Sequence, residues 1–238
     1  MLADYVSIDL ETTGLNPKED TILEIGAIRI RDGKEVDSFQ TLIDPKRTIP
    51  HHVSELTGIT QEDVAGKPVF RDVQYELLEF LGQDVLLGHS VLFDYSFLKR
   101  AFINNNGIAK KSKDAFDRNG IDTLKMARLK LQNLESRSLS ALCQYYEIPL
   151  EAHRAIEDAR ATHKLYQKIS EQFYTAEEPN TFPLIYKVKR EGPITKAQKE
   201  RLYKLLDQHK IVSAYDVEYL TKNEADRYLD KILAEYGR

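Results

Sequence analysis

The chain has 238 residues, of which 34 are Lys or Arg and 38 are Asp or Glu, so its formal net charge is -4, and 42% of its residues are hydrophobic. This size suits one large domain, or one domain with a small companion, and the composition is that of a soluble globular protein. No apolar run reaches the roughly 18 residues that a membrane span requires.

Three strands are predicted at the start of the chain, at residues 5–9, 22–31 and 36–43. These stretches are rich in β-branched and apolar residues, and turn residues such as Gly, Pro, Asn and Asp separate them. Asp32-Gly33 predicts a tight hairpin turn between the second and third strands. A loop containing Pro45 and Pro50 follows them.

A helix is predicted to begin near Thr60, because Asp63 stands at capping-box spacing and apolar residues repeat at helical spacing up to Leu81. A short apolar strand at residues 84–87 then precedes a helix that begins at about Asp94.

The stretch 109–119 shows little periodicity and predicts a polar loop, and helices follow at residues 124–131, 139–146 and 155–173. The change from adjacent strands to alternating strands and helices predicts an α/β fold, with a mixed sheet and helices packed on it.

A boundary is predicted at residues 177–183, which contain two prolines, and two helices follow it. Thr195 with Gln198, and Thr221 with Glu224, both have the spacing of a capping box. We therefore expect a first domain at residues 1–174, a linker at 175–193 and a small helical domain at 194–238.

The segment 184–210 is basic, although the chain as a whole is acidic. It carries eight basic and three acidic residues, a local balance of 8 - 3 = +5. Such a segment is either a solvated linker and helix face or a surface that binds a polyanion. The basic residues are Lys187, Lys189, Arg190, Lys196, Lys199, Arg201, Lys204 and Lys210.

Cysteine usage restricts the chemistry of any metal site. Cys143 is the one cysteine of the sequence, which excludes an intrachain disulfide and a zinc site built from cysteines. Carboxylates and histidines remain as metal ligands. No basic leader or hydrophobic signal region precedes the first apolar run at Tyr5, and we therefore expect a reduced, cytoplasmic protein.

Two acidic residues stand at the end of the first predicted strand, in the motif Asp9-Leu10-Glu11-Thr12-Thr13-Gly14. Residues two apart on a strand point to the same face, so Asp9 and Glu11 project together and Leu10 points into the opposite layer. Two like charges placed in this way repel each other unless a cation neutralises them. The alternative is that each carboxylate caps a turn or pairs with a surface lysine.

A further carboxylate, Asp94, follows the turn 88–93 at the start of a helix. Asp is common as a helix N-cap, so capping is the alternative to a functional role. His89 in the same turn either has a functional role or is a turn histidine whose hydrogen bonds are satisfied within the protein.

The third acidic element is His153-Arg154-Ala155-Ile156-Glu157-Asp158. Five positions along a helix correspond to a rotation of about 140°, so His153 and Asp158 converge only if His153 lies in the loop before the helix. A histidine with a pKa near 6.5 can accept a proton from water at neutral pH. The alternative is a surface histidine followed by an ordinary aspartate at a helix start.

The joint pattern is more specific than its parts. The ordered motifs around Asp9 and Glu11, Asp94, and His153 and Asp158 resemble those of the DEDDh family of 3′-to-5′ exonucleases, and within it the DnaQ-like proofreading exonucleases of bacterial DNA polymerase III. The resemblance covers residues 1 to about 174, and the stretches 22–27, 56–60, 122–124 and 138–143 are similar to the family's connecting segments.

This resemblance implies an RNase H-like fold whose mixed five-stranded sheet carries four carboxylates at one edge. Asp9, Glu11, Asp94 and Asp158 would hold two divalent cations, Mg²⁺ or Mn²⁺, which suit ligand sets made of oxygen. His153 would take the proton from the attacking water. The reaction would release nucleoside 5′-monophosphates from a 3′ end, in replication proofreading or in repair.

The resemblance also implies residues that contact the terminal nucleotide. These are Thr12, Thr13 and Gly14 after the first strand, Leu56, His89 and Phe93 as walls of a base pocket, and Arg137 as a phosphate ligand. The alternative is core packing for Leu56 and Phe93 and surface solvation for Arg137.

Two residues depart from the family pattern in this terminal pocket. Ser90 stands where the family often has Asn, and Thr57 stands where some members have His. Neither belongs to the metal ligands, and both bear on the preference between DNA and RNA ends.

The expected partners are single-stranded or frayed DNA ends and a DNA polymerase or another replication or repair protein. One alternative is an exoribonuclease of the same superfamily. Another is a non-catalytic module that binds nucleic-acid ends through the basic segment 184–210. For the C-terminal helices we expect a tethering role, in which they grip the substrate strand or dock on a partner protein.

Overall fold

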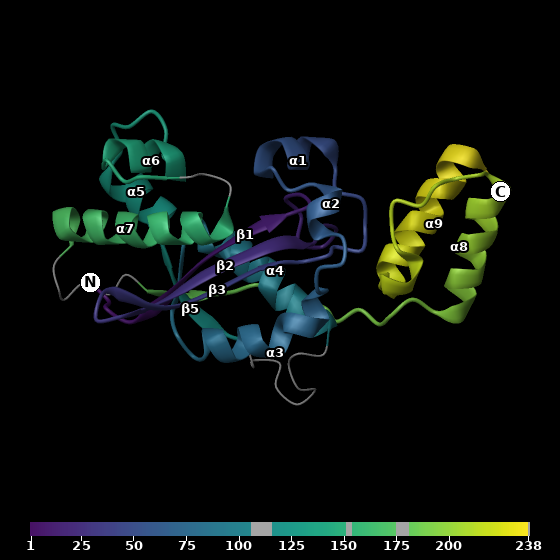
Figure 1. The fold of residues 1–238 in the computed structure, drawn as a ribbon, viewed down its shortest axis with the longest axis horizontal. Helices are drawn as coiled ribbons and strands as arrows, with labels where there is room; N and C mark the ends of the chain where they lie inside the picture. The colour runs from purple at the N-terminus through teal and green to yellow at the C-terminus, as the bar shows by residue number, and fades with distance from the viewer. Residues whose placement is uncertain (106–115, 151–153, 175–180, 238) are drawn as a thin grey trace.

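The computed structural model describes residues 1–105, 116–150, 154–174 and 181–237. They form a sheet covered by helices on both faces, followed by a separate group of C-terminal helices (Figure 1). The strands are β1 (Tyr5–Thr12), β2 (Ile22–Arg31), β3 (Lys34–Leu42), β4 (Leu86–Gly88), β5 (Arg118–Asp122) and β6 (Phe182–Leu184). The helices are α1 (His51–Thr57), α2 (Gln61–Val64), α3 (Phe70–Leu81), α4 (Val91–Asn104), α5 (Thr123–Lys130), α6 (Leu139–Tyr145), α7 (Ala155–Phe173), α8 (Lys196–Gln208), the 3₁₀ turn η1 (Val217–Tyr219) and α9 (Lys222–Tyr236).

The sheet is mixed and has the strand order β3-β2-β1-β4-β5-β6. Strands β1, β2 and β3 pair antiparallel, whereas β4 runs parallel to both β1 and β5. This arrangement confirms the predicted α/β fold with a mixed sheet, and the hairpin between β2 and β3 turns at Asp32 and Gly33, which both have positive φ.

The sheet has six strands where five were expected. The additional strand, β6, lies inside the predicted linker and pairs antiparallel with β5, with Arg118 opposite Leu184. Gly120 makes room for it, because a Cβ at Gly120 would lie 2.7 Å from the Leu184 side chain. A strand of three residues is too short to show a period in the sequence.

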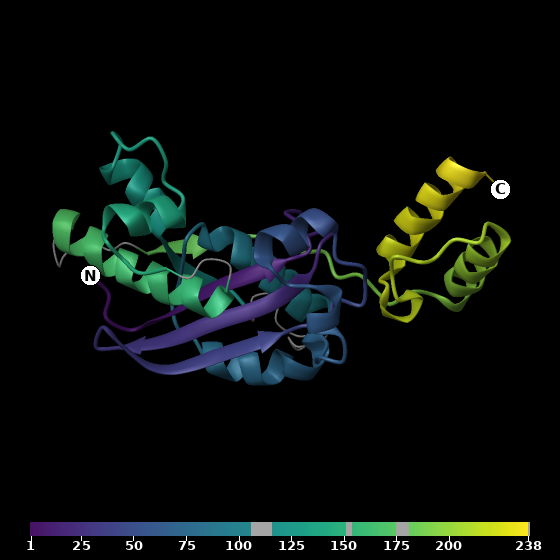
Figure 2. The ribbon, with the colours of Figure 1, turned by 45° about the horizontal axis from the view of Figure 1, so that its top comes forward.

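Alternation along β1 divides the core into two layers. Val6, Ile8 and Leu10 are buried in the apolar cluster that contains residues of α3 and α4. Tyr5 belongs to the cluster formed with α5, α6 and α7 on the opposite face. Figures 1 and 2 show these two groups of helices on opposite faces of the sheet. The prediction that Leu10 points away from Asp9 and Glu11 is therefore confirmed.

Helix α7 lies unusually close to the sheet at its first turn. A Cβ at Gly26 would lie 2.2 Å from the backbone carbon of Ala155, so the helix needs a glycine at this point of β2. The Ser7 hydroxyl donates to the Ala159 carbonyl at 2.8 Å, and the Ala155 N–H donates to the Glu24 carboxylate at 3.3 Å. These contacts set the first two turns of α7 against β1 and β2.

Several elements begin or end elsewhere than the sequence predicts. The capping box at Thr60 is confirmed, but it starts the short α2, and α3 is a separate helix that begins at Phe70. Gly66, with φ of 74°, and Pro68 interrupt the helical path between them.

The remaining differences are short elements in predicted loops. Helix α1 follows Pro50 and buries only Val53 and Thr57, so it shows no sustained apolar period. Strand β5 begins at Arg118, inside the predicted loop 109–119, whose residues up to 115 lie outside the described part of the chain. Strand β5 forms because β4 and β6 pair with it on either side.

The C-terminal helices have an apolar core of their own. Residues of α8 and α9 pack together with Val217 and Leu220, and both predicted capping boxes are formed, by Thr195 with Gln198 and by Thr221 with Glu224. We call residues 194–237 the C-terminal module. In Figures 1 and 2 the module lies beyond the end of the sheet at which β1 ends. No helix in the described ranges is long and apolar enough to cross a bilayer.

Replacing Gly26 with Ala tests the close approach of α7. The added methyl group collides with backbone atoms of α7, so we expect the free energy of unfolding to fall by about 1–3 kcal/mol, the usual effect of overpacking. Gly192→Ala is the control, because a Cβ at Gly192 meets nothing within 4 Å. Urea unfolding of both variants measures the effect, and equal stability of the two variants would contradict this account.

Candidate active site

Three carboxylates converge at the end of β1 where the first turn of α7 meets the sheet. One oxygen each of Asp9, Glu11 and Asp158 lies within 4.8 Å of the others. Asp9 and Glu11 come from the same face of β1, and Asp158 comes from the first turn of α7. The close packing of α7 on Gly26 brings these groups together, since Gly26 stands opposite Asp9 in the strand pairing.

Asp94 lies next to this group and is held by the backbone of β1. Its Oδ1 accepts the Leu10 N–H at 3.1 Å, between Asp9 and Glu11 in the chain, and the residue is 3% exposed. The alternative of a helix cap is wrong, because α4 begins at Val91 and its N-cap is Ser90, with φ of 77°. The predicted acidic residues are thus gathered at one place.

Burial and mutual repulsion raise the pKa values of this cluster. The pKa of Asp9 is well above its ordinary range, first because of burial and then because of the charges of Asp94 and Asp158. Burial, followed by the charges of Asp158 and Glu24, raises the pKa of Glu11 to about 7, against a smaller lowering by Arg154. Burial also raises the pKa of Asp94.

This donor set fits divalent cations. It offers oxygen atoms alone, which hard ions such as Mg²⁺ and Mn²⁺ prefer. Its carboxylates repel one another at close range inside the protein, and a cation between them would remove that repulsion. His153, the predicted proton acceptor, lies outside the described residues.

Two acidic residues near the cluster were not predicted to take part. The Glu24 carboxylate, opposite Glu11 in the strand pairing, accepts the Ala155 N–H and the Gln40 side-chain N–H at 3.3 and 3.0 Å. Glu24 therefore anchors the start of α7. Its signal in the sequence is that it is the one acidic residue of β2 and stands among apolar residues at the start of that strand.

The second residue is Asp122, the N-cap of α5. Its Oδ1 accepts the Lys125 N–H at 3.1 Å and the Ser90 N–H at 3.2 Å. It thereby fixes the turn from which α4 and Asp94 start. Its signal in the sequence is an aspartate just before a predicted helix, the ordinary pattern of an N-cap.

The loop after β1 holds the predicted nucleotide contacts Thr12, Thr13 and Gly14. The Thr12 hydroxyl donates to the Gly14 carbonyl at 2.7 Å, and the Thr13 hydroxyl donates to Asp20 at 3.3 Å. A Cβ at Gly14 would lie 2.4 to 2.6 Å from the Asp20 carboxylate. The side chains of these residues thus shape the loop, and their contact with a nucleotide stays a prediction.

His89 and Arg137 belong to one hydrogen-bonded group. His89 Nε2 donates to the Arg137 carbonyl at 3.0 Å, since a carbonyl can only accept, and Nδ1 lies 2.8 Å from the Thr123 hydroxyl. Burial lowers the pKa of His89. The Arg137 guanidinium donates to the Leu131 carbonyl at 3.0 Å, so it also supports the turn before α6.

Leu56 and Phe93 have different surroundings. Leu56 is 62% exposed, so the alternative of core packing is wrong for this residue. Phe93 is half-buried and packs on Phe97 with a centroid separation of 4.9 Å. Their place in a base pocket stays a prediction, as do the roles of His89 and Arg137.

Comparisons with known proteins agree with this geometry. A family model described as an exonuclease, represented by RNase T, matches residues 6–166. The PolC-type DNA polymerase III of Clostridium perfringens is 38% identical over 174 residues, which cover 71% of this chain and 12% of that polymerase. The PolC-type polymerase of Thermotoga petrophila is 39% identical over 170 residues, again 71% of this chain and 12% of the relative. The chain thus corresponds to a small part of these polymerases.

Solved structures show the same fold. Exonuclease X in complex with 5′ overhanging duplex DNA has a TM-score of 0.56 and 27% identity, covering 74% of this chain and 96% of that one. Escherichia coli exonuclease I, in complex with a dA16 oligonucleotide, has a TM-score of 0.61 and 18% identity, covering 72% and 42% of the two chains. These matches confirm the resemblance that the sequence motifs indicate.

The raised pKa of Glu11 gives a pH dependence that can be measured without divalent cations. A carboxyl whose pKa is raised by folding stabilises the folded state in its protonated form, so this contribution is lost as pH rises from 4.5, the ordinary value, to about 7. Glu11→Gln is neutral throughout, so its stability relative to the native chain should grow across this window and stay level above it.

Urea unfolding in a chelator, repeated across the window, measures this difference. Glu76→Gln, at an exposed position of α3, is the matched control. A stability difference for Glu11→Gln that does not change with pH would show that folding does not raise the pKa of Glu11.

Proposed function

Because the chain belongs to the exonuclease family that RNase T represents, we propose that it hydrolyses DNA from the 3′ end and releases nucleoside 5′-monophosphates. The observation that carries this proposal is the convergence of Asp9, Glu11 and Asp158, with Asp94 bound to the strand between the first two. The likeness to exonucleases crystallised with DNA supports DNA as the substrate.

Asp9, Glu11, Asp94 and Asp158 would hold two divalent cations, Mg²⁺ or Mn²⁺. When bound, two such cations activate water for in-line attack on phosphorus and stabilise the leaving 3′ oxygen. The protein contributes the placement of the four carboxylates. Leu10 N–H fixes Asp94, and the bond between Ala155 and Glu24 fixes the turn that carries Asp158.

His153 would accept the proton of the attacking water. The residue precedes α7 by two positions in the sequence. Thr12, Thr13 and Gly14 would contact the terminal nucleotide through the loop that Asp20 supports. Leu56, His89 and Phe93 would form the wall for the terminal base, and Arg137 would contact a phosphate.

The biological role that fits best is proofreading or repair, beside a DNA polymerase or another replication protein. The matched relatives are polymerases of the PolC type, and each is far longer than this chain. Residues 1–174 would form the exonuclease domain, 175–193 a linker and 194–238 a separate helical domain. Cytoplasmic localisation stays a prediction.

Removing one carboxylate tests the function directly. We expect the native chain with Mg²⁺ or Mn²⁺ to release mononucleotides from single-stranded DNA. Asp9→Asn should lose this activity by at least about 10²-fold, because a negative charge is lost from the cation site. Asp230→Asn, at an exposed position of α9, is the control and should keep full activity.

Strands labelled at the 5′ end distinguish the direction of hydrolysis. Hydrolysis from the 3′ end shortens the labelled strand step by step, whereas hydrolysis from the 5′ end releases the label at once. Release of the label as a mononucleotide, or full activity of Asp9→Asn, would overturn the proposal.

His153 can be tested separately. Loss of a general base costs about 10²- to 10⁴-fold in rate, so His153→Ala should reduce kcat by that factor while metal binding measured by calorimetry is kept. The control is His209→Ala in the C-terminal module. Unchanged kcat in His153→Ala would assign the proton transfer to another group.

Two alternatives remain as outcomes of the same assays. Faster hydrolysis of a matched RNA strand would indicate an exoribonuclease with the same chemistry. Salt-sensitive binding without cleavage, unchanged by Asp158→Asn, would indicate a non-catalytic module that binds ends.

A further inference from the structure

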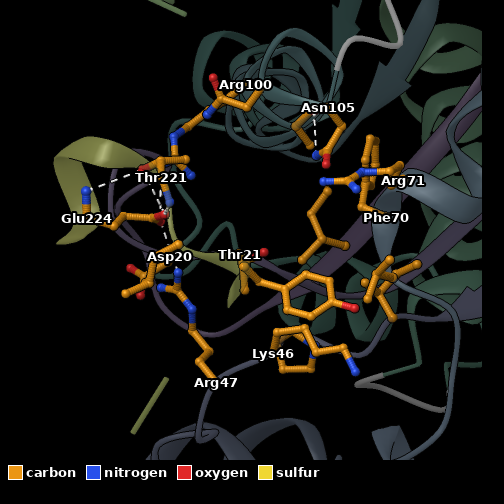
Figure 3. Close-up of a pocket in the computed structure, with 18 of the residues that line it drawn as sticks. Asp20, Thr21, Lys46, Arg47, Phe70, Arg71, Arg100, Asn105, Thr221 and Glu224 are labelled. Atoms are coloured by element: carbon orange, nitrogen blue, oxygen red, sulfur yellow. Dashed lines mark hydrogen bonds and ion pairs between the residues drawn. The ribbon is translucent and has the colours of Figure 1, made fainter. Parts of the chain in front are cut away.

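Two largely buried arginines of the exonuclease part face one glutamate of α9. Arg47 Nη2 and Arg100 Nη2 lie 3.0 and 3.3 Å from Glu224 Oε1. The three side chains expose 13%, 12% and 10% of their surface, in the same order. Figure 3 shows the two arginines approaching Glu224 from different sides. A buried charge that loses its partner is strongly unfavourable, so separating Glu224 from these arginines is costly.

Arg47 also binds the loop that follows β1. Its Nη1 donates to the Glu19 carbonyl, and its guanidinium lies 5.0 Å from the centre of the Tyr215 ring. Arg227 of α9 donates to the Lys18 carbonyl at 3.2 Å. The module therefore contacts Lys18 directly, and Arg47, which pairs with Glu224 of the module, binds the next residue of the same loop. This loop starts at Thr13, immediately after the strand that carries Asp9 and Glu11.

The same contacts leave a basic surface exposed. In the segment 184–210, seven of the eight basic side chains are exposed, and they are Lys187, Lys189, Arg190, Lys196, Arg201, Lys204 and Lys210. Of its three acidic residues, Glu191 is turned inward, where its carboxylate lies 3.9 Å from Arg100. Only Glu200 and Asp207 remain exposed beside them, and they pair with Lys196 and Lys210. Exposed basic side chains thus outnumber exposed acidic ones along residues 184–210, and this surface is positive.

We propose that Arg47, Arg100 and Glu224 form an ion-pair latch that fixes the C-terminal module beside the loop after β1. The latched module presents the basic face of α8 to single-stranded DNA, upstream of the 3′ end that lies at the carboxylates. A positively charged surface follows a nucleic-acid backbone without reading its sequence. This inference rests on the proposed function for the identity of the strand, but the latch itself does not.

Glu224→Gln removes the charge of the latch and keeps the cap of α9. The reason is visible in α8, whose capping box uses Gln198 at the position that Glu224 takes in α9. Arg47→Met removes one partner of Glu224 in the exonuclease part and leaves the capping box of α9 unchanged. Asp230→Asn on the exposed face of α9 serves as the matched control.

The first measurement is the distance between two spin labels, attached to Glu76→Cys on α3 and Gln208→Cys on α8. The native Cys143 is buried, so the label should react with the two introduced cysteines. We expect a narrow distribution in the native chain and in Asp230→Asn, and a broad one in Glu224→Gln and Arg47→Met. Because the ion pair of Arg47 with Glu224 is lost in both single variants, their effects should be less than additive in the double variant. An unchanged distribution in both variants would overturn the latch.

The second measurement compares substrates of different length. Glu224→Gln should raise the KM for a long single strand of DNA at least about five-fold, the lower end of the usual effect of one site on the affinity of another. It should leave kcat and the KM for a dinucleotide unchanged. Equal changes for both substrates would overturn the role of the module in holding the strand.

The two proposals fail in different ways. If the native chain hydrolyses neither substrate, the proposed function fails. The distances between the spin labels then still test the latch. Binding of a long fluorescently labelled DNA strand, measured by its anisotropy in the presence of a chelator, tests the basic face. Loss of binding in Lys204→Ala together with Arg201→Ala would support the basic face, and unchanged binding would overturn it.

Discussion

The approach of α7 to the first two strands is the constraint on which the site depends. Gly26 has no side chain where the helix meets β2, and a single methyl group there would overlap the helix backbone. Ser7 and Glu24 bind the helix backbone on either side of this point. The two turns fixed in this way contain Asp158. The packing thereby brings Asp158 next to Asp9, although the two residues lie far apart in the sequence. Backbone packing, rather than attraction between side chains, assembles the carboxylates.

The assembly works against electrostatic repulsion. Burial and neighbouring charges raise the pKa of Asp9 and Glu11, so their ionised forms oppose folding. Hydrogen bonds from the backbone compensate in part, notably from Leu10 to Asp94. Groups with strongly shifted pKa values gather at functional sites because function requires what stability disfavours. Under the proposed function, this unfavourable charge is the property that would favour the binding of cations.

Local patterns predicted much of this arrangement from the sequence. The two-residue period of β1 placed Asp9 and Glu11 on one face, and the helical period from about residue 155 placed Asp158 in a first turn. Features that depend on distant partners were missed. Strand β6 has three residues and forms because β5 offers an edge. The role of Glu24, the one acidic residue of β2, becomes visible only when the position of α7 is known. The position of His153 stays a prediction.

The C-terminal module joins the rest of the chain by a different principle from the one that builds its core. Its apolar side chains pack between α8 and α9. The contact with the exonuclease part is made by polar groups, through backbone hydrogen bonds from Thr48 to Ala214 and from Asp216 to Lys46 and through the ion pair of Arg47 with Glu224. An apolar contact tolerates sliding because it has no direction, whereas buried ion pairs leave a costly charge unpaired when the partners shift. A module held by such pairs keeps one orientation. Only a fixed orientation lets the basic residues of α8 act at a constant distance from the carboxylates.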